Sequence, residues 1–463
     1  MPFFGRKREL SQFQAFFSQD EANLAIVFGR RRVGKSELIK QSIQESGLRH
    51  LYLECSQTSE AQHVELLVEL GARLFNLPGI AADRFDKALE FLAQQSVKEP
   101  LIVVLDEYPY LRDLVTGCDS ILQAFSDRWR GRSKLKLVLC GSYIDVMKSV
   151  LEYKSPLYGR AALTLQLEPL NYREAALFYP EASDEDKVRF FSIFGGMPYY
   201  NTLINSGLSV RENILSLLSS EAAVLDNEIT MVLRSELSKL NNANLVLTAI
   251  ANGARKFSDI LSQSKIAKSP TLADSLERLT AMGLVAKDAP INDEANRRRI
   301  YYRIADPLTD FYYRYIFRNS SQLHVLPEED FYDIFVGNDF ETQFVPKAFE
   351  GICRQYLILR NKAGLHRPPF FKIGRYFYDL PKEKRNGEFD VVTEDQEGYV
   401  FYEAKFRSQP LTMQKIRLEM EQVRASPLAA DRFGFFSRSG FAEDVEPQDN
   451  VALYSLSDVY GTL

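Results

Sequence analysis

Two glycines, a lysine and a serine stand at a spacing that can hold the phosphates of a nucleotide. The stretch "VFGRRRVGKSELIK", residues 27–40, fits G-x-x-x-x-G-K-[ST] with Gly29, Gly34, Lys35 and Ser36. Glycines let the backbone N–H groups of such a loop turn toward phosphate oxygens, and Lys35 adds positive charge near the β and γ phosphates. Because the Ser36 hydroxyl can bind Mg²⁺, the stretch predicts a site for a nucleotide with Mg²⁺.

The context of this loop is that of a phosphate-binding loop. The apolar run "LAIVF" (24–28) predicts a strand that ends at Gly29, and "SELIKQSIQE" predicts a helix after Lys35. The remaining residues of the loop and the first turn of the helix are also predicted to line the nucleotide; they are Arg30, Arg31, Arg32, Val33 and Glu37. The three arginines can equally be solvated loop charges.

A nucleotide hydrolase also needs carboxylates beside the phosphates. "LIVVLDEYPYL" predicts a buried strand with Asp106 and Glu107 at its carboxyl end, where open parallel sheets bind ligands. We expect Asp106 to hold the water shell of Mg²⁺, and Glu107 to orient and deprotonate the attacking water. Ser142 ends the strand "LKLVLCGS" and can sense the γ-phosphate. The alternative for a lone Asp-Glu pair at a strand end is a helix cap.

A second group of charged residues lies near the carboxyl terminus. "GEFDVVTEDQEGYVFYEAKF" predicts two strands joined at "DQEG", with Asp390 on the first and Glu403 and Lys405 on the second. Alternation places Glu403 and Lys405 on one face, and the hairpin can bring Asp390 to it. Two carboxylates and a lysine suit a divalent metal that activates water against a phosphodiester. The alternative is a cross-strand salt bridge.

The elements around these residues predict an α/β protein. The first 200 residues alternate apolar strands with helical segments, which is typical of a parallel sheet covered on both faces. Residues 241–305 predict three helices and a β-hairpin, the layout of a winged helix. After about residue 335 a second α/β unit is predicted, with a helix at 341–359, a helix at 411–425 and strands near 371–379, 388–394, 399–406, 432–437 and 451–455.

Composition narrows the class of protein. A chain of 463 residues is expected to form about two to four domains. The net charge of -5 argues against coating nucleic acid by bulk charge. No apolar run is long enough to span a membrane and no signal peptide is evident, so a cytoplasmic protein without membrane contact is expected. The four cysteines lack CxxC spacing, so neither structural zinc nor a disulfide framework is expected.

The N-terminal motifs resemble a known family, the "ATPase domain predominantly from Archaea", close to the STAND and AAA+ branches of P-loop ATPases. The resemblance is carried by "FFGRKREL", the phosphate-binding loop, "VLDEYPYL", "LVLCGS", "SPLYGRAALTLQLEPLNYREA" and "FGGMPYY". It implies that ATP is the nucleotide, that Phe4, Gly5 and Arg6 lie near the adenine and ribose, and that Pro198 packs on the base. Arg160 can face a phosphate or can be structural.

The resemblance also gives the winged helix a place after the ATPase core. Such a domain can insert its third helix, here about 269–282, into the DNA major groove. Phosphate contacts would come from basic residues in and beside it, namely Lys265, Lys268, Arg278 and Arg297 to Arg299. The alternative is a lid or a protein contact. The aromatic helical stretch "FYYRYIF" that follows is expected to be core.

The C-terminal stretch resembles the D…(D/E)xK signature of the PD-(D/E)xK nuclease-like, or restriction-endonuclease-like, fold. The same signature occurs in the C-terminal DUF234-type domain that accompanies these ATPases. The resemblance implies that Glu350 joins Asp390 and Glu403 as a metal ligand, with Lys405 in catalysis, and places Gln422 on the helix after the second strand.

The predicted organisation is therefore an ATPase domain at 1–205, a helical lid and winged helix at 206–320, and a nuclease-like domain at 321–463. The predicted function is Mg²⁺-dependent ATP hydrolysis coupled to a domain that acts on DNA. The alternative is an ATP-operated switch whose later domains only bind a partner, which is protein or nucleic acid. Self-association is left open, because no arginine finger is assigned.

Overall fold

The computed structural model describes residues 3–78, 82–220, 223–225, 228–236, 240–296, 299–380, 385–428 and 430–462. The chain forms two compact units. The first comprises Met1–Leu170 and Met197–Tyr199, and the second comprises Asn171–Gly196 and Tyr200–Leu463. The chain thus leaves the first unit after Leu170 and returns to it for three residues. The three-domain division stays a prediction.

The first unit contains a five-stranded parallel sheet in the order β2-β3-β4-β1-β5, as the alternating pattern predicts. Its strands are β1 (Asn23–Gly29), β2 (Arg49–Glu54), β3 (Leu101–Asp106), β4 (Leu135–Gly141) and β5 (Ala161–Leu167). Its helices are α1 (Lys7–Phe17), α2 (Lys35–Ser46), α3 (Glu60–Phe75), α4 (Phe85–Gln95), α5 (Tyr108–Leu114), α6 (Cys118–Trp129) and α7 (Ile144–Leu151).

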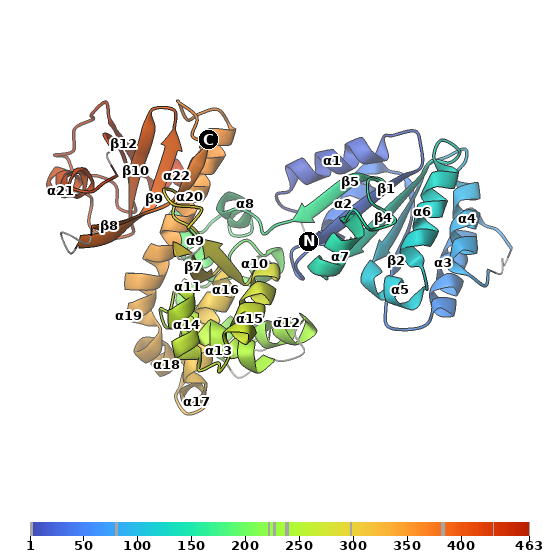
Figure 1. Ribbon diagram of the computed structural model, residues 1–463, viewed down its shortest axis with the longest axis horizontal. Helices are drawn as coiled ribbons and strands as arrows, with labels where there is room; N and C mark the ends of the chain where they lie inside the picture. Colours follow the sequence, from blue (N-terminus) through green and yellow to red (C-terminus); the bar gives the residue numbers. More distant parts are fainter. Residues whose placement is uncertain are drawn as a thin grey trace. The chain divides into compact units, whose positions relative to one another are not determined.

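Helices cover both faces of this sheet (Figure 1). One face packs on α3, α4, α5 and α6 in a single apolar core, and α1 and α2 lie against β5 and β1. All six residues of β3 and all seven of β4 are buried. This explains why these strands are continuous apolar runs and not alternating ones. The carboxyl ends of β1, β3 and β4 carry Gly29, Asp106 and Gly141.

The second unit begins with helices. They are α8 (Tyr172–Ala176), α9 (Asp184–Phe194), α10 (Pro198–Leu203), which begins within the first unit's segment, α11 (Val210–Ile214) and α12 (Glu228–Glu236). The predicted winged-helix layout follows as α13 (Leu240–Ala251), α14 (Phe257–Ser264), α15 (Ser269–Ala281), β6 (Val285–Asp288) and β7 (Tyr301–Ile304), with β6 and β7 antiparallel. We call residues 285–304 the wing.

The aromatic stretch after the wing is core, as expected. It begins with α16 (Pro307–Phe311) and continues as a π-helical turn at Tyr312–Ile316, in which Tyr313 and Tyr315 are buried. The short helices that follow are Phe317–Asn319, α17 (Ser320–Leu323), α18 (Glu328–Phe335), α19 (Gly337–Asp339) and a π-helical turn at Phe340–Phe344.

The C-terminal part is a five-stranded mixed sheet in the order β12-β11-β10-β9-β8. β8 (Lys372–Leu380), β9 (Arg385–Asp395) and β10 (Gly398–Lys405) are antiparallel, whereas β11 (Arg432–Ser437) and β12 (Val451–Ser455) run parallel to β10. The long helix α20 (Val345–Lys362) precedes the sheet, α21 (Met413–Arg424) connects β10 to β11, and α22 (Leu456–Tyr460) ends the chain (Figure 1). α21 packs its apolar side on the sheet.

The pairing of β8 with β9 contains a bulge beside Asp390, one of the predicted site residues. Gly374 pairs with Val392 and Tyr376 pairs with Phe389, so Arg375 alone lies opposite both Asp390 and Val391. An extra residue in one strand breaks the simple alternation of side chains and re-aims those at the bulge. The direction of Asp390 therefore does not follow from counting residues along β9.

Candidate functional site

The phosphate-binding loop lies between the end of β1 and the start of α2. Gly29 and Gly34 have φ angles of +156° and +90°, and a Cβ atom at Gly29 would lie 2.5 Å from the backbone oxygen of Leu167. Only glycine fits there without a shift of β5. Gly34 is also the N-cap of α2, a helix of 12 residues. The free N–H groups of the helix start therefore lie in the loop, where an anion can bind them.

Lys35 is held inside the loop. Its side chain is buried, and its Nζ donates hydrogen bonds to the backbone oxygens of Gly29 (3.0 Å) and Arg30 (3.1 Å). These carbonyls keep the ammonium group beside the loop. The Lys35 ammonium group is therefore already out of solvent and close to the place where phosphate oxygens would bind.

Ser36 and Asp106, the predicted Mg²⁺ ligands, are in contact although 70 residues separate them. Ser36 Oγ donates to Asp106 Oδ2 over 2.7 Å. Tyr52, on β2, also donates its hydroxyl to this carboxylate. Burial of Asp106 opposes its charge, but hydrogen bonds from Cys140, Tyr52 and Ser36 lower its pKa. A hydroxyl beside an ionised carboxylate is an oxygen donor set that fits Mg²⁺.

Glu107 is held by Ser142. Ser142 Oγ lies 2.9 and 2.8 Å from the two carboxylate oxygens of Glu107, and the Ser142 backbone N–H donates to Oε2 over 3.2 Å. Glu107 itself has a left-handed φ of +49° as the N-cap of α5, and its side chain does not cap the helix. The left-handed backbone is costly for a residue with a Cβ and is a feature of functional sites. The helix-cap alternative for this carboxylate does not hold.

Two of the residues expected around the base and ribose, Arg6 and Pro198, lie beside the loop. Arg6 is buried and donates to the backbone oxygens of Val33 (3.0 Å) and Glu168 (2.6 Å), so it braces the loop from behind. Phe4 and Gly5 precede it in the chain. A Cβ atom at Gly34 would lie 3.5 Å from the Pro198 ring, so Pro198 contacts the loop from the returning segment. Their roles toward a base stay predictions.

The remaining loop side chains differ in their surroundings. The guanidinium of Arg32 lies 3.9 Å from the centre of the Tyr199 ring, which belongs to the returning segment. Arg31 is exposed, Arg30 is half-buried, and the exposed Glu37 pairs with Lys40 at 3.3 Å. Arg160 makes a two-bond ion pair with Asp127 (3.0 and 2.9 Å), which favours its structural alternative.

In the C-terminal sheet, Glu403 and Lys405 share a face and form an ion pair, as alternation predicts. Lys405 also lies 3.0 Å from Glu419, which α21 contributes. Burial raises the pKa of Glu403, against the opposing effect of Lys405. Burial acts against the charge of Lys405, but the two carboxylates raise its pKa. Lys405 thus lies between two acids of the sheet and helix.

Asp390 and Glu350 occupy the neighbouring part of this region. Arg375 Nε lies 3.1 Å from Asp390 Oδ1 across the bulge. Burial raises the pKa of Glu350, on α20, to about 8, and the charges of Asp390 and Glu403 add to this increase. The structure therefore brings Glu350, Asp390 and Glu403 within electrostatic range of one another, with Arg375 and Lys405 among them.

This acidic region does not fit a metal ion in the form observed. No three Asp, Glu, His or Cys side chains in the described part of the chain are grouped so that they could hold one. The chain's own cations bind the carboxylates instead, Arg375 at Asp390 and Lys405 at Glu403 and Glu419. The predicted ligand set of Glu350, Asp390 and Glu403 stays a prediction, and no chemical step through a metal follows from this geometry.

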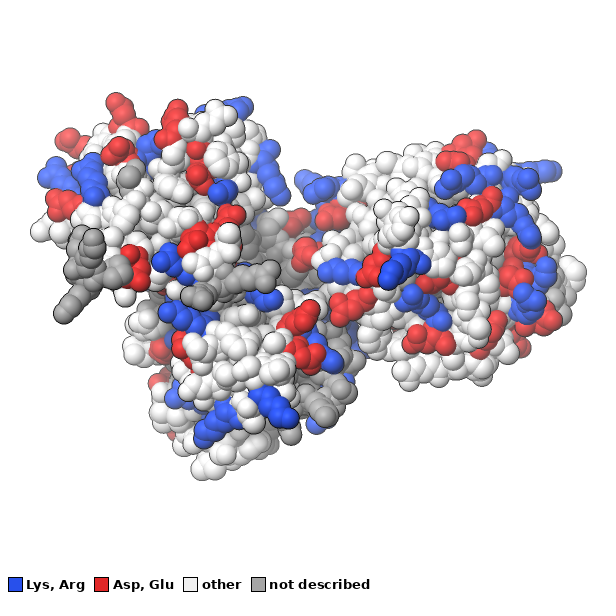
Figure 2. All heavy atoms as spheres, viewed as in Figure 1, with Lys and Arg blue, Asp and Glu red and all other residues white. Residues whose placement is uncertain are grey.

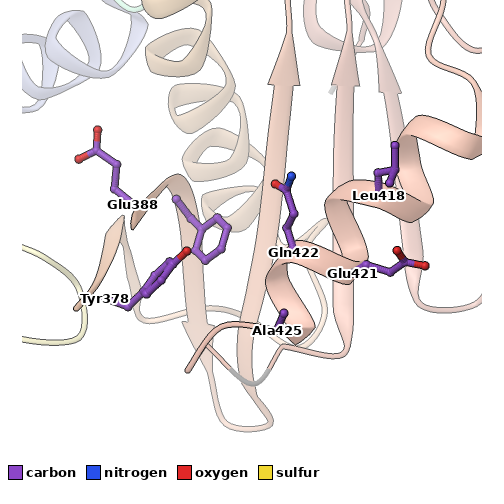
Figure 3. A pocket seen from close by; sticks show the side chains of 7 residues that line it. Tyr378, Glu388, Leu418, Glu421, Gln422 and Ala425 are labelled. Carbon is purple, nitrogen blue, oxygen red and sulfur yellow. The ribbon is translucent and has the colours of Figure 1, made fainter. Parts of the chain in front are cut away.

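Gln422 lies on α21 as expected, one turn beyond Glu419. It lines an open pocket formed by α21 and the β8–β9 strands; the lining residues are Tyr378, Glu388, Phe389, Leu418, Glu421, Gln422 and Ala425. Figure 3 shows Gln422, Glu421 and Leu418 on the helix, with Tyr378 and Glu388 on the strands. Glu419, not Gln422, contacts Lys405.

Two of the six predicted basic residues of the winged helix form ion pairs within the protein. Arg278 pairs with Asp274 at 3.1 Å, and Arg299 pairs with Asp293 at 3.1 Å and lies over the Phe377 ring. Arg297 and Arg298 lie outside the described residues. Lys265 and Lys268 flank α14 and α15 as cap residues. On the face shown in Figure 2, basic and acidic side chains are interspersed over both units.

Several residues of these sites do not follow from the sequence, among them Arg375, Tyr52 and Glu419. Tyr52 lies in an ordinary apolar strand, "LYLEC", and no sequence spacing distinguishes it from its neighbours. It comes close to Asp106 because β2 pairs with β3 in the register that sets Glu54 opposite Asp106. Glu419 lies one helical turn before Gln422. Residues three apart on a helix lie on the same side, so the assignment of Gln422 to the site could have indicated Glu419 as well.

The geometry of the first unit defines the class of the protein: a P-loop ATPase, with its phosphate-binding loop after β1 and carboxylates after β3. Residues 3–203 match the family described as "ATPase domain predominantly from Archaea", and residues 312–418 match a family of "Archaea bacterial proteins of unknown function", DUF234. The predicted family resemblance is confirmed. No helix within the described ranges has both the length and the hydropathy to cross a lipid bilayer.

Known proteins of two organisms are similar to this chain or to part of it. An uncharacterized protein of Methanocaldococcus jannaschii, MJECL04, is 26% identical over 408 residues, which are 88% of each chain. An uncharacterized ATP-binding protein of that organism, MJ0423, is 38% identical over 53 residues, 11% of this chain and 90% of its own. The Walker-type ATPase PABY2304 of Pyrococcus abyssi has a similar fold, with a TM-score of 0.50, 18% identity and coverage of 67% of this chain and 96% of its own.

Proposed function

We propose that this protein binds ATP with Mg²⁺, hydrolyses it, and uses the nucleotide state to control a C-terminal domain that acts on DNA. The observation that supports it best is the pair of contacts at the carboxyl ends of β3 and β4. Ser36 meets Asp106, and Ser142 meets Glu107. These contacts bring four residues from three distant segments together at one edge of the sheet, which supports a site for nucleotide hydrolysis.

The residues have distinct roles in this proposal. Loop N–H groups and Lys35 hold the phosphates, and Ser36 and Asp106 would hold Mg²⁺, which neutralises charge that develops on the phosphate oxygens. Glu107 accepts a proton from the attacking water. Ser142 engages Glu107 in the observed structure. A γ-phosphate that bonds to the Ser142 hydroxyl competes with this contact and releases the carboxylate for the water.

The C-terminal domain has two candidate roles. The order of helix, three antiparallel strands, crossover helix and parallel strand supports a nuclease-like domain, as does the convergence of Glu350, Asp390, Glu403 and Lys405. The second candidate is a domain that only binds its partner. The ion pairs that Arg375 and Lys405 make with the carboxylates favour this second candidate, because they occupy the groups that cleavage would need.

DNA cleavage separates the two roles. Plasmid and single-stranded DNA would be incubated with wild type or Asp390→Ala, with Mg²⁺ or Mn²⁺, with and without ATP. Cleavage by the wild type that disappears in Asp390→Ala is the result expected of a nuclease. If neither protein cuts while both hydrolyse ATP, the domain is a binding module. Asp379→Ala, an exposed aspartate of β8, is the matched control and should behave as wild type.

A further inference from the structure

Three arginines from three elements converge where the wing meets the C-terminal sheet. They are Arg303 of β7, Arg354 of α20 and Arg375 of β8. Asp288 of β6 lies 3.0 Å from Arg303 and 3.8 Å from Arg375, so both share one carboxylate. Arg375 also reaches Asp390 at 3.1 Å. The cluster therefore lies directly beside the acidic residues of the sheet.

Arg354 is the member of this cluster that has no ion-pair partner in the described part of the chain. Its guanidinium makes no hydrogen bond and no ion pair within the described ranges, and its Nε is buried without a partner. Glu350, one helical turn earlier, is within electrostatic range but forms no ion pair with it. Burial, and then repulsion by Arg375 and Arg303, lower the pKa of Arg354. A buried polar group without a partner is unfavourable unless a ligand supplies one.

The packing of the wing holds this arrangement in place. Ile291 is buried in the apolar core of the C-terminal sheet, and its N–H donates to the backbone oxygen of Arg375 over 2.7 Å. Asn292 exchanges two hydrogen bonds with the backbone of Phe377, at 2.9 and 3.2 Å. Arg255 pairs with Glu388 at 2.7 Å. The wing is thus part of the same packed body as β8, and it positions Arg303 and Asp288 against Arg375.

We propose that Arg303, Arg354 and Arg375 form a phosphate-binding site between the wing and the C-terminal sheet, and that it takes a backbone phosphate of a DNA strand. This inference rests on the proposed function and specifies its DNA contact. Guanidinium groups bind phosphate oxygens through paired hydrogen bonds, and Arg354 has its terminal nitrogens available for them. The side chains of Arg303 and Asp390 are each 37% exposed, so a strand can approach the cluster from solvent.

The neighbouring carboxylates set the limits of this site. Asp288, Asp390 and Glu350 lie near the arginines, and their negative charges disfavour the binding of a second phosphate. Asp288 already pairs with both Arg303 and Arg375, and Asp390 already pairs with Arg375. A single phosphate could therefore bind Arg354 while the ion pairs of Arg303 and Arg375 stay intact. It also lies beside Asp390, so the same strand passes the residues predicted to act on it.

The test measures binding of fluorescein-labelled single-stranded and duplex DNA by anisotropy over a series of KCl concentrations. Arg354→Gln should weaken binding and reduce the slope of log affinity against log salt by about 1, as expected for one lost phosphate contact. Arg354→Lys keeps the charge and should retain the slope. Arg360→Gln, on the same helix but bonded to Tyr356 and Leu365, is the matched control.

Stability distinguishes a ligand contact from a structural role. Because the Arg354 guanidinium makes no hydrogen bond or ion pair with any of the described residues, Arg354→Gln should leave the Tm unchanged or raise it. Unchanged affinity and salt slope in Arg354→Gln, with a wild type that binds DNA, would overturn this inference and leave the proposed function intact. A wild type that binds no DNA with or without ATP would instead remove the DNA part of the proposed function, and this inference with it.

Discussion

Replacing Glu107 by Gln should slow ATP hydrolysis by about 10²- to 10⁴-fold, the usual contribution of a general base. The amide keeps the size of the side chain but cannot accept the proton of the attacking water. ATP affinity should stay within a few-fold of wild type, because Lys35, Ser36 and the loop N–H groups are unchanged. Phosphate release under single-turnover conditions and titration with a fluorescent ATP analogue measure the two quantities.

A control separates catalysis from general damage at this edge of the sheet. Glu54 ends β2, directly opposite Asp106, and its side chain is exposed. Glu54→Gln should hydrolyse ATP at the wild-type rate. Normal turnover in Glu107→Gln would remove the assignment of Glu107 as the base, whatever Glu54→Gln does.

Replacing Lys35 by Ala should weaken ATP binding by about 10- to 100-fold, because a hydrogen bond to a charged group is worth about 1.5–3 kcal/mol. The variant loses the ammonium group that the Gly29 and Arg30 carbonyls hold in the loop. Hydrolysis should fall with binding. Equilibrium titration of wild type and variant with the same nucleotide and Mg²⁺ measures the change.

Lys40→Ala is the matched control for this variant. Lys40 lies on the same helix, its side chain is 58% exposed, and it pairs with the exposed Glu37. Its removal should leave ATP affinity at the wild-type value. Equal affinity in wild type and Lys35→Ala would refute the position of the nucleotide site.

Much of the fold could be predicted because its strongest signals are local. The run "LIVVLDE" shows both a buried strand and the carboxylates that end it, and the glycine spacing of residues 29–36 marks a loop whose conformation glycine alone allows. The strands of the C-terminal sheet were located for the same reason, since alternation and turn residues are properties of short segments.

The contacts that complete the sites could not be predicted, because they depend on pairing between distant segments. Tyr52 reaches Asp106 only through the β2–β3 register. The bulge opposite Arg375 redirects Asp390, and nothing in "GEFDVV" indicates it. The docking of Ile291 into the core of the C-terminal sheet joins the wing to β8. The sequence pattern predicts that basic residues of the wing contact DNA, but Arg299 forms an ion pair with Asp293.

We propose that the nucleotide state of the first unit changes how the second unit binds DNA. The most direct test is the affinity of Glu107→Gln for one labelled DNA, measured with and without ATP and Mg²⁺, beside Lys35→Ala under the same conditions. We expect ATP to change the DNA affinity of Glu107→Gln by about 5-fold or more, as is typical of coupled sites, and to leave the DNA affinity of Lys35→Ala unchanged. The same affinity with and without ATP in Glu107→Gln, when ATP is shown to be bound, would contradict it.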